Sequence, residues 1–195
     1  MPPQLNDTSG GPLGLLLSRR SGSAKRMTGP SPTPVELDKV FEAATRVPDH
    51  GKLTPWRFIL FEGDGRARFG EVLAECFRTA NPDADDERLR VERERFLRAP
   101  VVIGVISRVR AGLPIPEWEQ MMSAGACGMT LVLAAHAHGY VANWITEWCA
   151  YDPCVRAKLG LSDHERIAGI IYIGKSAVPL EDRPRPDFRA LVTRF

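Results

Sequence analysis

Residues 121–140 read MMSAGACGMTLVLAAHAHGY and form the longest apolar stretch of the chain. A stretch of this length could cross a bilayer, so a membrane span and a buried core helix are the two candidates. Two interior histidines, many small residues and the adjacent Glu117 and Glu119 favour a buried core helix over about 117–138. We therefore expect a globular fold around this helix and no membrane partner.

Strand patterns lie on both sides of this helix. Residues 101–107 (VVIGVIS) and 167–174 (IAGIIYIG) are continuous apolar runs, which are typical of buried strands. Residues 56–61 (WRFILF) are aromatic and branched, and residues 141–145 follow the long helix directly. The pattern predicts a sheet of about four strands.

Helix signals separate these strands. Thr33, Pro34 and Glu36 form a capping pattern that starts a helix over about 34–46. Further helices are expected at 12–20, 65–80 and 83–98, and after Asp152-Pro153. Strands separated by helices indicate a layered α+β fold. No linker divides the chain, so we expect one domain over 12–195 and a flexible extension over 1–11.

Composition argues against a nucleic-acid partner. Twenty-six basic and 24 acidic side chains give a net charge of +2, which favours a small-molecule partner. Residues 87–98 (ERLRVERERFLR) mix both signs and are expected to form a solvated helix face. An RNA-binding module that uses Arg88 to Arg98 and Arg183 to Arg194 is a minor alternative.

The cysteines and histidines do not form a metal pattern. The four cysteines show no C-x-x-C pair, so reduced thiols and a cytoplasmic location are expected. They are Cys76, Cys127, Cys149 and Cys154. His136 and His138 lie two apart on a helix and point about 200° apart, so they cannot share a metal. Residues 1–11 carry no signal-peptide pattern.

One glycine motif and one arginine motif are candidates for binding a phosphate. Gly63-Asp64-Gly65 follows a strand, but the next glycine is Gly70, one residue too late for a dinucleotide fingerprint, so we expect a strand-to-helix turn. Arg19-Arg20-Ser21 combines two cations, a hydroxyl and a Gly/Ser turn, a set that can grip a phosphate through charge-assisted hydrogen bonds.

Several such motifs follow one another along residues 15–174. They are Arg19-Arg20-Ser21, ATRVPDH at 44–50 leading to PWRF at 55–58, WEQ at 118–120 with SAG at 123–125, and Gly139-Tyr140 before Trp144. In this order and spacing the chain resembles the nitroreductase family of flavoproteins, and most closely its smallest bacterial branch of NAD(P)H nitroreductases.

The resemblance implies a nitroreductase-like fold with a mainly antiparallel sheet flanked by helices. It also implies an intertwined homodimer with FMN at the subunit interface. The residues that it assigns to the cofactor are Arg19, Arg20 and Ser21 for the phosphate and ribityl chain, Arg46 and His50 reaching the flavin from the other subunit, and Trp144, Ile145 and Thr146 along the isoalloxazine. Arg183 and Arg185 match a late basic phosphate contact, but the tail aligns poorly.

The chain departs from the family pattern at a few positions. Lys52 and Thr54 stand where larger relatives carry Asn and Gln, and Lys52 could either favour the reduced flavin anion or face water. Ile145 stands where a polar side chain is common, which limits side-chain contacts there. The small residues of 122–128 could pack against a second copy or within the chain.

The expected activity is an FMN-dependent oxidoreductase in which NAD(P)H reduces the flavin, which then reduces a nitroaromatic, a quinone or a similar acceptor in a ping-pong cycle. The flavin carries this chemistry, so no catalytic side chain is expected. A flavin-binding sensor or carrier without turnover is the main alternative. The physiological acceptor and the preference for NADH or NADPH are not encoded in any motif.

Overall fold

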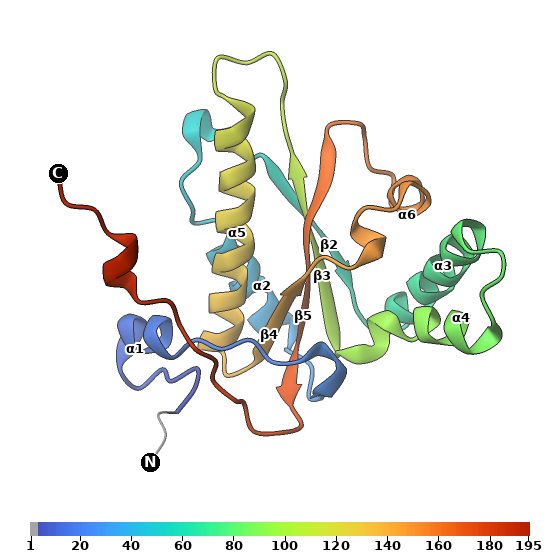
Figure 1. Cartoon of the computed structure of the whole chain (residues 1–195), viewed down its shortest axis with the longest axis horizontal. Helices are drawn as coiled ribbons and strands as arrows, with labels where there is room; N and C mark the ends of the chain where they lie inside the picture. Colours follow the sequence, from blue (N-terminus) through green and yellow to red (C-terminus); the bar gives the residue numbers. More distant parts are fainter. Residues whose placement is uncertain (1–3) are drawn as a thin grey trace.

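A computed structural model describes residues 4–195 of the chain. A central sheet carries helices on both faces (Figure 1). In chain order the elements are α1 (Gly11–Ser18), η1 (Ala24–Arg26), β1 (Met27–Thr28), α2 (Pro34–Ala44), η2 (His50–Lys52), β2 (Trp56–Phe61), α3 (Gly65–Ala80), α4 (Asp86–Arg93), η3 (Arg95–Arg98), β3 (Val101–Arg108), α5 (Glu117–Ala137), β4 (Val141–Ile145), η4 (Trp148–Ala150), α6 (Pro153–Lys158), β5 (Glu165–Ser176) and η5 (Phe188–Leu191).

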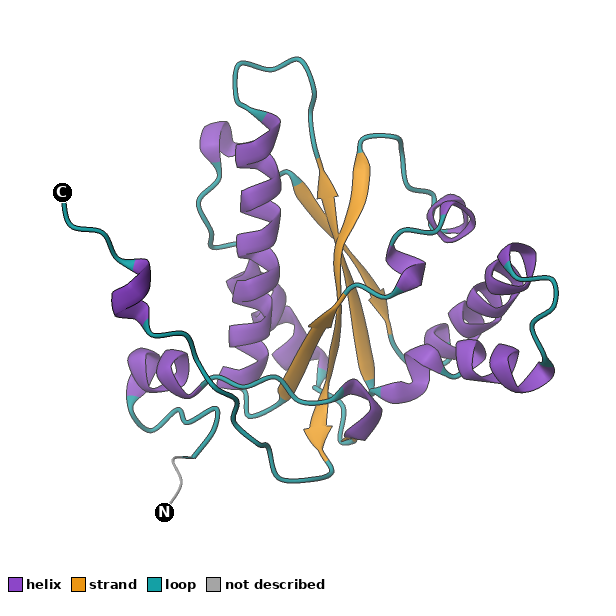
Figure 2. Cartoon of the chain, viewed as in Figure 1, coloured by secondary structure: helices purple, strands orange, loops and turns teal. Residues whose placement is uncertain are grey.

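The sheet is built around β5, its longest strand (Figure 2). β3 pairs with one side of β5, and β2 pairs with β3. β4 pairs with the other side of β5, the short strand β1 pairs with residues 175–176 at the end of β5, and every pairing is antiparallel. The predicted antiparallel sheet is confirmed. It has five strands rather than about four because β1 has only two residues, too few to show a pattern.

The two faces of the sheet bury different layers of helices. Val101, Ile103 and Val105 of β3 pack with α2 and α5, whereas Val102 and Ile106 pack with α3, η3 and α6. This alternation follows from the two-residue period of a strand. Because both faces of β3 are covered, nearly every residue of the strand is apolar, and the buried strand predicted from this run is confirmed.

The helix boundaries agree with the local signals. Thr33 Oγ1 accepts a hydrogen bond from Glu36 N, and the Glu36 carboxylate accepts one from Thr33 N, so the capping box that starts α2 is confirmed. Gly63 has a φ of 50°, and the turn at 63–65 joins β2 to α3 as expected.

The long helix α5 packs a buried side against one face of the sheet, as expected for a core helix, while side chains in its first turns are exposed (Figure 1). Within residues 4–195, none of the helices combines the length and the apolar character that crossing a bilayer requires. His136 is fully buried with Nδ1 3.1 Å from the Tyr140 carbonyl, whereas His138 is exposed. The two histidines are packing and surface residues.

The charged segment 83–98 departs from the expectation. It divides into α4 and η3, and its inner face is not solvated, because Glu92 and Arg95 are buried. The two side chains neutralise each other: Arg95 Nε lies 2.6 Å from Glu92 Oε2. A mixed-sign segment looks solvent-exposed by composition, but opposite charges three residues apart can enter the interior as a pair.

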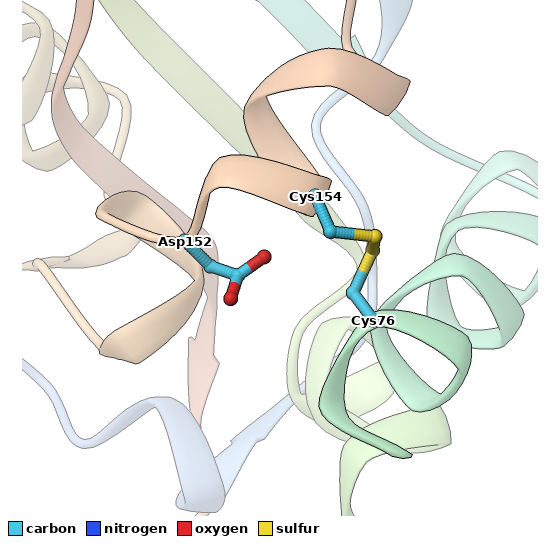
Figure 3. Close-up of side chains that lie close together, drawn as sticks. All are labelled: Cys76, Asp152 and Cys154. Atoms are coloured by element: carbon cyan, nitrogen blue, oxygen red, sulfur yellow. A yellow bond between two sulfur atoms is a disulfide. The ribbon is translucent and has the colours of Figure 1, made fainter. Parts of the chain in front are cut away.

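The expectation of four reduced thiols is wrong for two of them. Cys76 of α3 and Cys154 of α6 form a disulfide, while Cys127 and Cys149 are free and buried. Asp152 lies beside the two sulfur atoms and caps α6 through Val155 N (Figure 3). The bonded cysteines are 78 residues apart in sequence, so local spacing carries no signal of their pairing.

The predicted flexible extension covers residues 1–11, of which 1–3 lie outside the described residues. In the described part, Asn6 bonds to both the backbone N and the backbone O of Arg20, at 2.8 and 3.0 Å. The Ser18 hydroxyl accepts a hydrogen bond from Asp7 N. This segment is therefore tied to the loop that follows α1.

Candidate functional site

A hollow of about 430 Å³ lies where the loop after α1, the middle of α5 and the end of β4 meet. The loop supplies a cation and a hydroxyl, α5 supplies apolar side chains, and β4 supplies an aromatic wall. The lining residues are Arg19, Ser21, Met129, Val132, Trp144, Ile145 and Thr146. Five of these seven are predicted site residues. Met129 and Val132 are additions, because an apolar helix shows no pattern that separates a cavity face from a core face.

The arginine loop is held close to β4. Gly22 N donates to Ala142 O at 3.2 Å, and Asn143 Nδ2 donates to Gly22 O. A Cβ at Gly22 would lie 2.7 Å from Cγ2 of Val141, so the approach requires glycine. The Ser-Gly turn therefore places Ser21 beside the end of β4.

Arg19 is the cation that lines the hollow. Its Nη1 donates to Ser21 Oγ at 3.2 Å, and its backbone O accepts from Arg185 Nη2 at 3.1 Å. Burial lowers the pKa of the Arg19 guanidinium, and the nearby positive charges of Arg185, Arg183 and Arg20 lower it further. These arginines repel one another, and an anion placed among them would relieve the repulsion.

Arg20 lies outside the lining of this hollow. Its Nε donates to Glu181 O at 2.7 Å and its Nη1 donates to Ser21 O at 3.3 Å. Arg19 has φ −55° and ψ 127°, so the chain is extended there and consecutive side chains diverge. Arg20 therefore contacts a neighbouring hollow of about 290 Å³ and holds the C-terminal tail.

Trp144 forms a fixed wall. Its Nε1 donates to Ala168 O at 3.2 Å, and its ring packs over two glycines. A Cβ would lie 1.8 Å from Trp144 Nε1 if built at Gly169 and 2.8 Å from Cη2 if built at Gly128. Of the small residues of α5, Gly128 therefore packs within the chain, against Trp144. Gly125 has no atom of its own chain within 4 Å of a Cβ built there.

Comparison with known proteins identifies the family. Residues 16–175 match the sequence model of the Nitroreductase family. The chain belongs to the nitroreductase family. A relative named "Putative NAD(P)H nitroreductase YdjA" from Escherichia coli K12 is 36% identical over 162 residues, which are 83% of this chain and 86% of the relative. A "Putative NAD(P)H nitroreductase" from Haemophilus influenzae is 35% identical over 163 residues, 83% and 86% of the two chains.

Solved structures show the same fold. A nitroreductase-like family protein from Bacillus cereus superposes with a TM-score of 0.79 and 23% identity, covering 92% of this chain and 93% of that chain. A "putative nitroreductase" from Desulfovibrio desulfuricans, solved in complex with FMN, superposes with a TM-score of 0.69 and 23% identity, covering 93% of this chain and 95% of that chain. The chain therefore has the family fold that the resemblance predicted.

The remaining predicted residues lie apart from the hollow of their own chain. Arg46 and His50 are exposed, and His50 Nδ1 lies 2.7 Å from Glu119 Oε2 near the start of α5. Lys52 is also exposed. Arg185 reaches the arginine loop through Arg19 O, as described above.

Proposed function

We propose that this nitroreductase is an FMN-dependent oxidoreductase that uses NAD(P)H to reduce a nitroaromatic, a quinone or a similar small acceptor. The observation that carries the proposal is that one hollow is lined at one place by Arg19, which has further arginines near it, and at another by the fixed indole of Trp144. A flavin mononucleotide has the matching shape and charge, because a dianionic phosphate ends one side of the molecule and a flat ring ends the other. The NAD(P)H nitroreductase names of the relatives and the FMN in the Desulfovibrio structure support the same proposal.

The residues present fit this cofactor. Arg19 and Ser21 would hold the phosphate and ribityl chain, with Arg183 and Arg185 adding positive charge from the tail. Trp144, Ile145 and Thr146 would lie along the ring. When bound, FMN would supply the redox chemistry, a ping-pong transfer of hydride from NAD(P)H through N5 to the acceptor.

The proposal includes a homodimer. Arg46 and His50 do not line the hollow of their own chain, and we propose that they reach the hollow of a second copy. Large apolar side chains are exposed on two helices, as a chain with an unpartnered interface would show. They are Leu13, Leu16 and Leu17 of α1 and Trp118, Met121 and Met122 of α5.

An Arg19→Ala variant tests the assignment of the phosphate site. Because Arg19 is the one cation that lines the hollow in the described part of the chain, we expect its removal to lose most of the bound flavin. Arg78→Ala removes an exposed arginine of α3 on the opposite face of the sheet and serves as the matched control. Full flavin retention in Arg19→Ala, measured by visible absorbance of the purified protein, would count against the assignment.

A further inference from the structure

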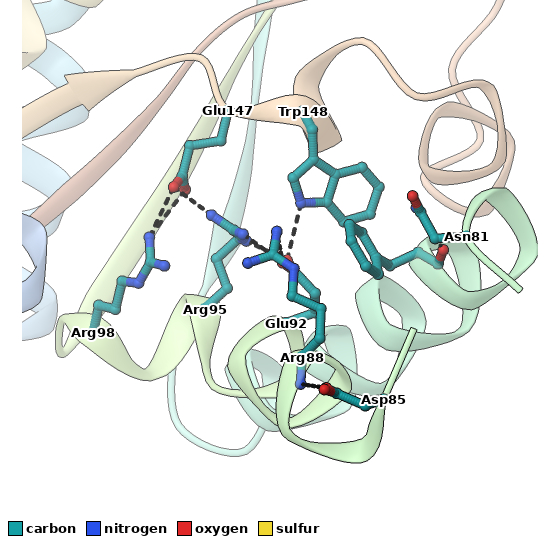
Figure 4. A network of polar contacts seen from close by, with 9 residues as sticks. Asn81, Asp85, Arg88, Glu92, Arg95, Arg98, Glu147 and Trp148 are labelled. Atoms are coloured by element: carbon teal, nitrogen blue, oxygen red, sulfur yellow. Dashed lines mark hydrogen bonds and ion pairs between the residues drawn. The ribbon is translucent and has the colours of Figure 1, made fainter. Parts of the chain in front are cut away.

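Glu147, the residue that follows the lining residues Ile145 and Thr146, is held by contacts on the side away from the hollow. Ile145 and Thr146 line the hollow, and Glu147 turns away from it towards η3. The Glu147 carboxylate accepts hydrogen bonds from Arg95 Nη1 and from Arg98 Nη1, the latter at 2.9 and 3.1 Å (Figure 4). Two arginines thus hold one carboxylate immediately beyond the proposed flavin wall.

The next residue is anchored to the same helical layer. Trp148 Nε1 donates to Glu92 Oε2 at 2.9 Å, and Arg95 donates to both oxygens of that carboxylate at 2.6 and 2.8 Å. Arg88 adds a further ion pair to Glu92 at 2.9 Å. The ring of Trp148 also packs against Phe77 of α3, with centroids 5.2 Å apart. Two consecutive residues after the wall are therefore fixed by partly buried polar contacts.

The centre of this network is buried, which restricts the positions that its side chains can take. The Glu92 side chain is fully buried and the Arg95 side chain is 5% exposed. Burial raises the pKa of Glu147, but hydrogen bonds from Arg95 and Arg98 outweigh it and leave that pKa lowered. The carboxylate is therefore held in its charged form. A buried ion pair adds little stability over an apolar packing of similar volume, so its distinctive contribution is a fixed orientation.

We propose that Glu147 is a positioning residue that sets the ligand-facing backbone of Ile145 and Thr146. Its two arginine partners lie on η3, which packs into the core beneath the sheet, so they form a rigid support. This inference rests on the proposed function, because that function places FMN against Ile145 and Thr146. Loss of the Glu147 charge would let the wall shift without removing any residue that touches the flavin.

A comparison of two carboxylates that are each paired with arginine, the half-buried Glu147 and the buried Glu165, tests this role. Glu147→Gln keeps the shape of the side chain but loses its charge. Glu165→Gln is the matched control, because Glu165 is 7% exposed and pairs with Arg57 at 2.5 Å, yet it does not line the hollow. The measurements are the Kd for FMN, the visible circular dichroism of bound flavin at saturating FMN, and the thermal midpoint of each purified variant.

Positioning and mere stabilisation give different results. We expect both variants to lower the thermal midpoint, but Glu147→Gln alone to raise the Kd for FMN by about tenfold and to change the flavin circular dichroism. Glu147→Asp, which keeps the charge, should recover part of the affinity. Equal FMN affinity and equal spectra in Glu147→Gln and Glu165→Gln would overturn the inference.

Two further outcomes separate this inference from the proposed function. If Glu147→Gln does not fold, Arg98→Lys keeps the positive charge but loses the paired contacts, and the same shifts in Kd and spectrum are expected. Unchanged values in that variant would overturn the role. A wild-type protein that fails to take up FMN would instead overturn the proposed function and this inference with it.

Discussion

Trp144 and Gly169 are in direct contact across the β4–β5 pair. The indole occupies the volume that a side chain at position 169 would need, because a Cβ there would lie 1.8 Å from Trp144 Nε1. The neighbouring carbonyl of Ala168 accepts the hydrogen bond of that same nitrogen. The orientation of the aromatic wall is therefore set by the absence of a side chain on the neighbouring strand.

A Gly169→Ala substitution should displace this wall. The new methyl group would overlap the indole, and overpacking of this kind costs about 1–3 kcal/mol of stability. We expect a lower thermal midpoint and weaker FMN binding, both measurable by flavin-fluorescence titration and thermal denaturation. Gly65→Ala is the control, because a Cβ there meets only Arg68 Nη2 at 3.7 Å. Equal behaviour of the two variants would show that Gly169 does not fix Trp144.

The Arg57–Glu165 ion pair should make the free energy of unfolding depend on pH in the acid range. The hydrogen bond from Arg57 lowers the pKa of Glu165 below the ordinary value of 4.5. A lowered carboxylate pKa stabilises the fold above the unfolded pKa, and the effect is lost as pH falls through the folded pKa. We expect Glu165→Gln to be less stable than wild type at pH 7, with the difference shrinking below pH 4.5 in urea titrations. A difference that stays constant with pH would contradict this.

The free cysteines should be unreactive in the folded protein. Burial raises the pKa of Cys127 and of Cys149 to about 12, so little thiolate forms at pH 8. Thiol titration should find no reactive thiol in the native state, two per chain after denaturation, and four after denaturation and reduction. Four thiols without reductant would show that Cys76 and Cys154 are not bonded.

The disulfide should stabilise the side of the fold opposite α5. A crosslink between residues 78 apart restricts the unfolded chain, and such crosslinks contribute about 2–4 kcal/mol. A Cys76→Ser and Cys154→Ser double variant should therefore lose stability in denaturant titrations, and added reductant should destabilise wild type but not the variant. Identical midpoints for both proteins without reductant would contradict a stabilising role.

Much of the fold is predictable because its signals are local. The capping residues Thr33 and Glu36 mark the start of α2, and apolar runs mark β3 and β5. In the site, the Arg-Arg-Ser motif predicts Arg19 and Ser21 and the family resemblance adds Trp144, and the structure brings these three residues together around one hollow.

The features that escaped prediction depend on distant contacts or on side-chain direction. The burial of Glu92 and Arg95 depends on Glu147 and Trp148, about 50 residues away in sequence. The divergence of Arg20 from Arg19 depends on one backbone conformation, which the Arg-Arg-Ser motif does not encode.

The proposed function is tested most directly by a titration of the purified protein with FMN, combined with sedimentation to obtain its mass. We expect one tightly bound FMN per chain in a dimer, and bleaching of the flavin absorbance when NAD(P)H is added without oxygen. A monomer that takes up no FMN would contradict it.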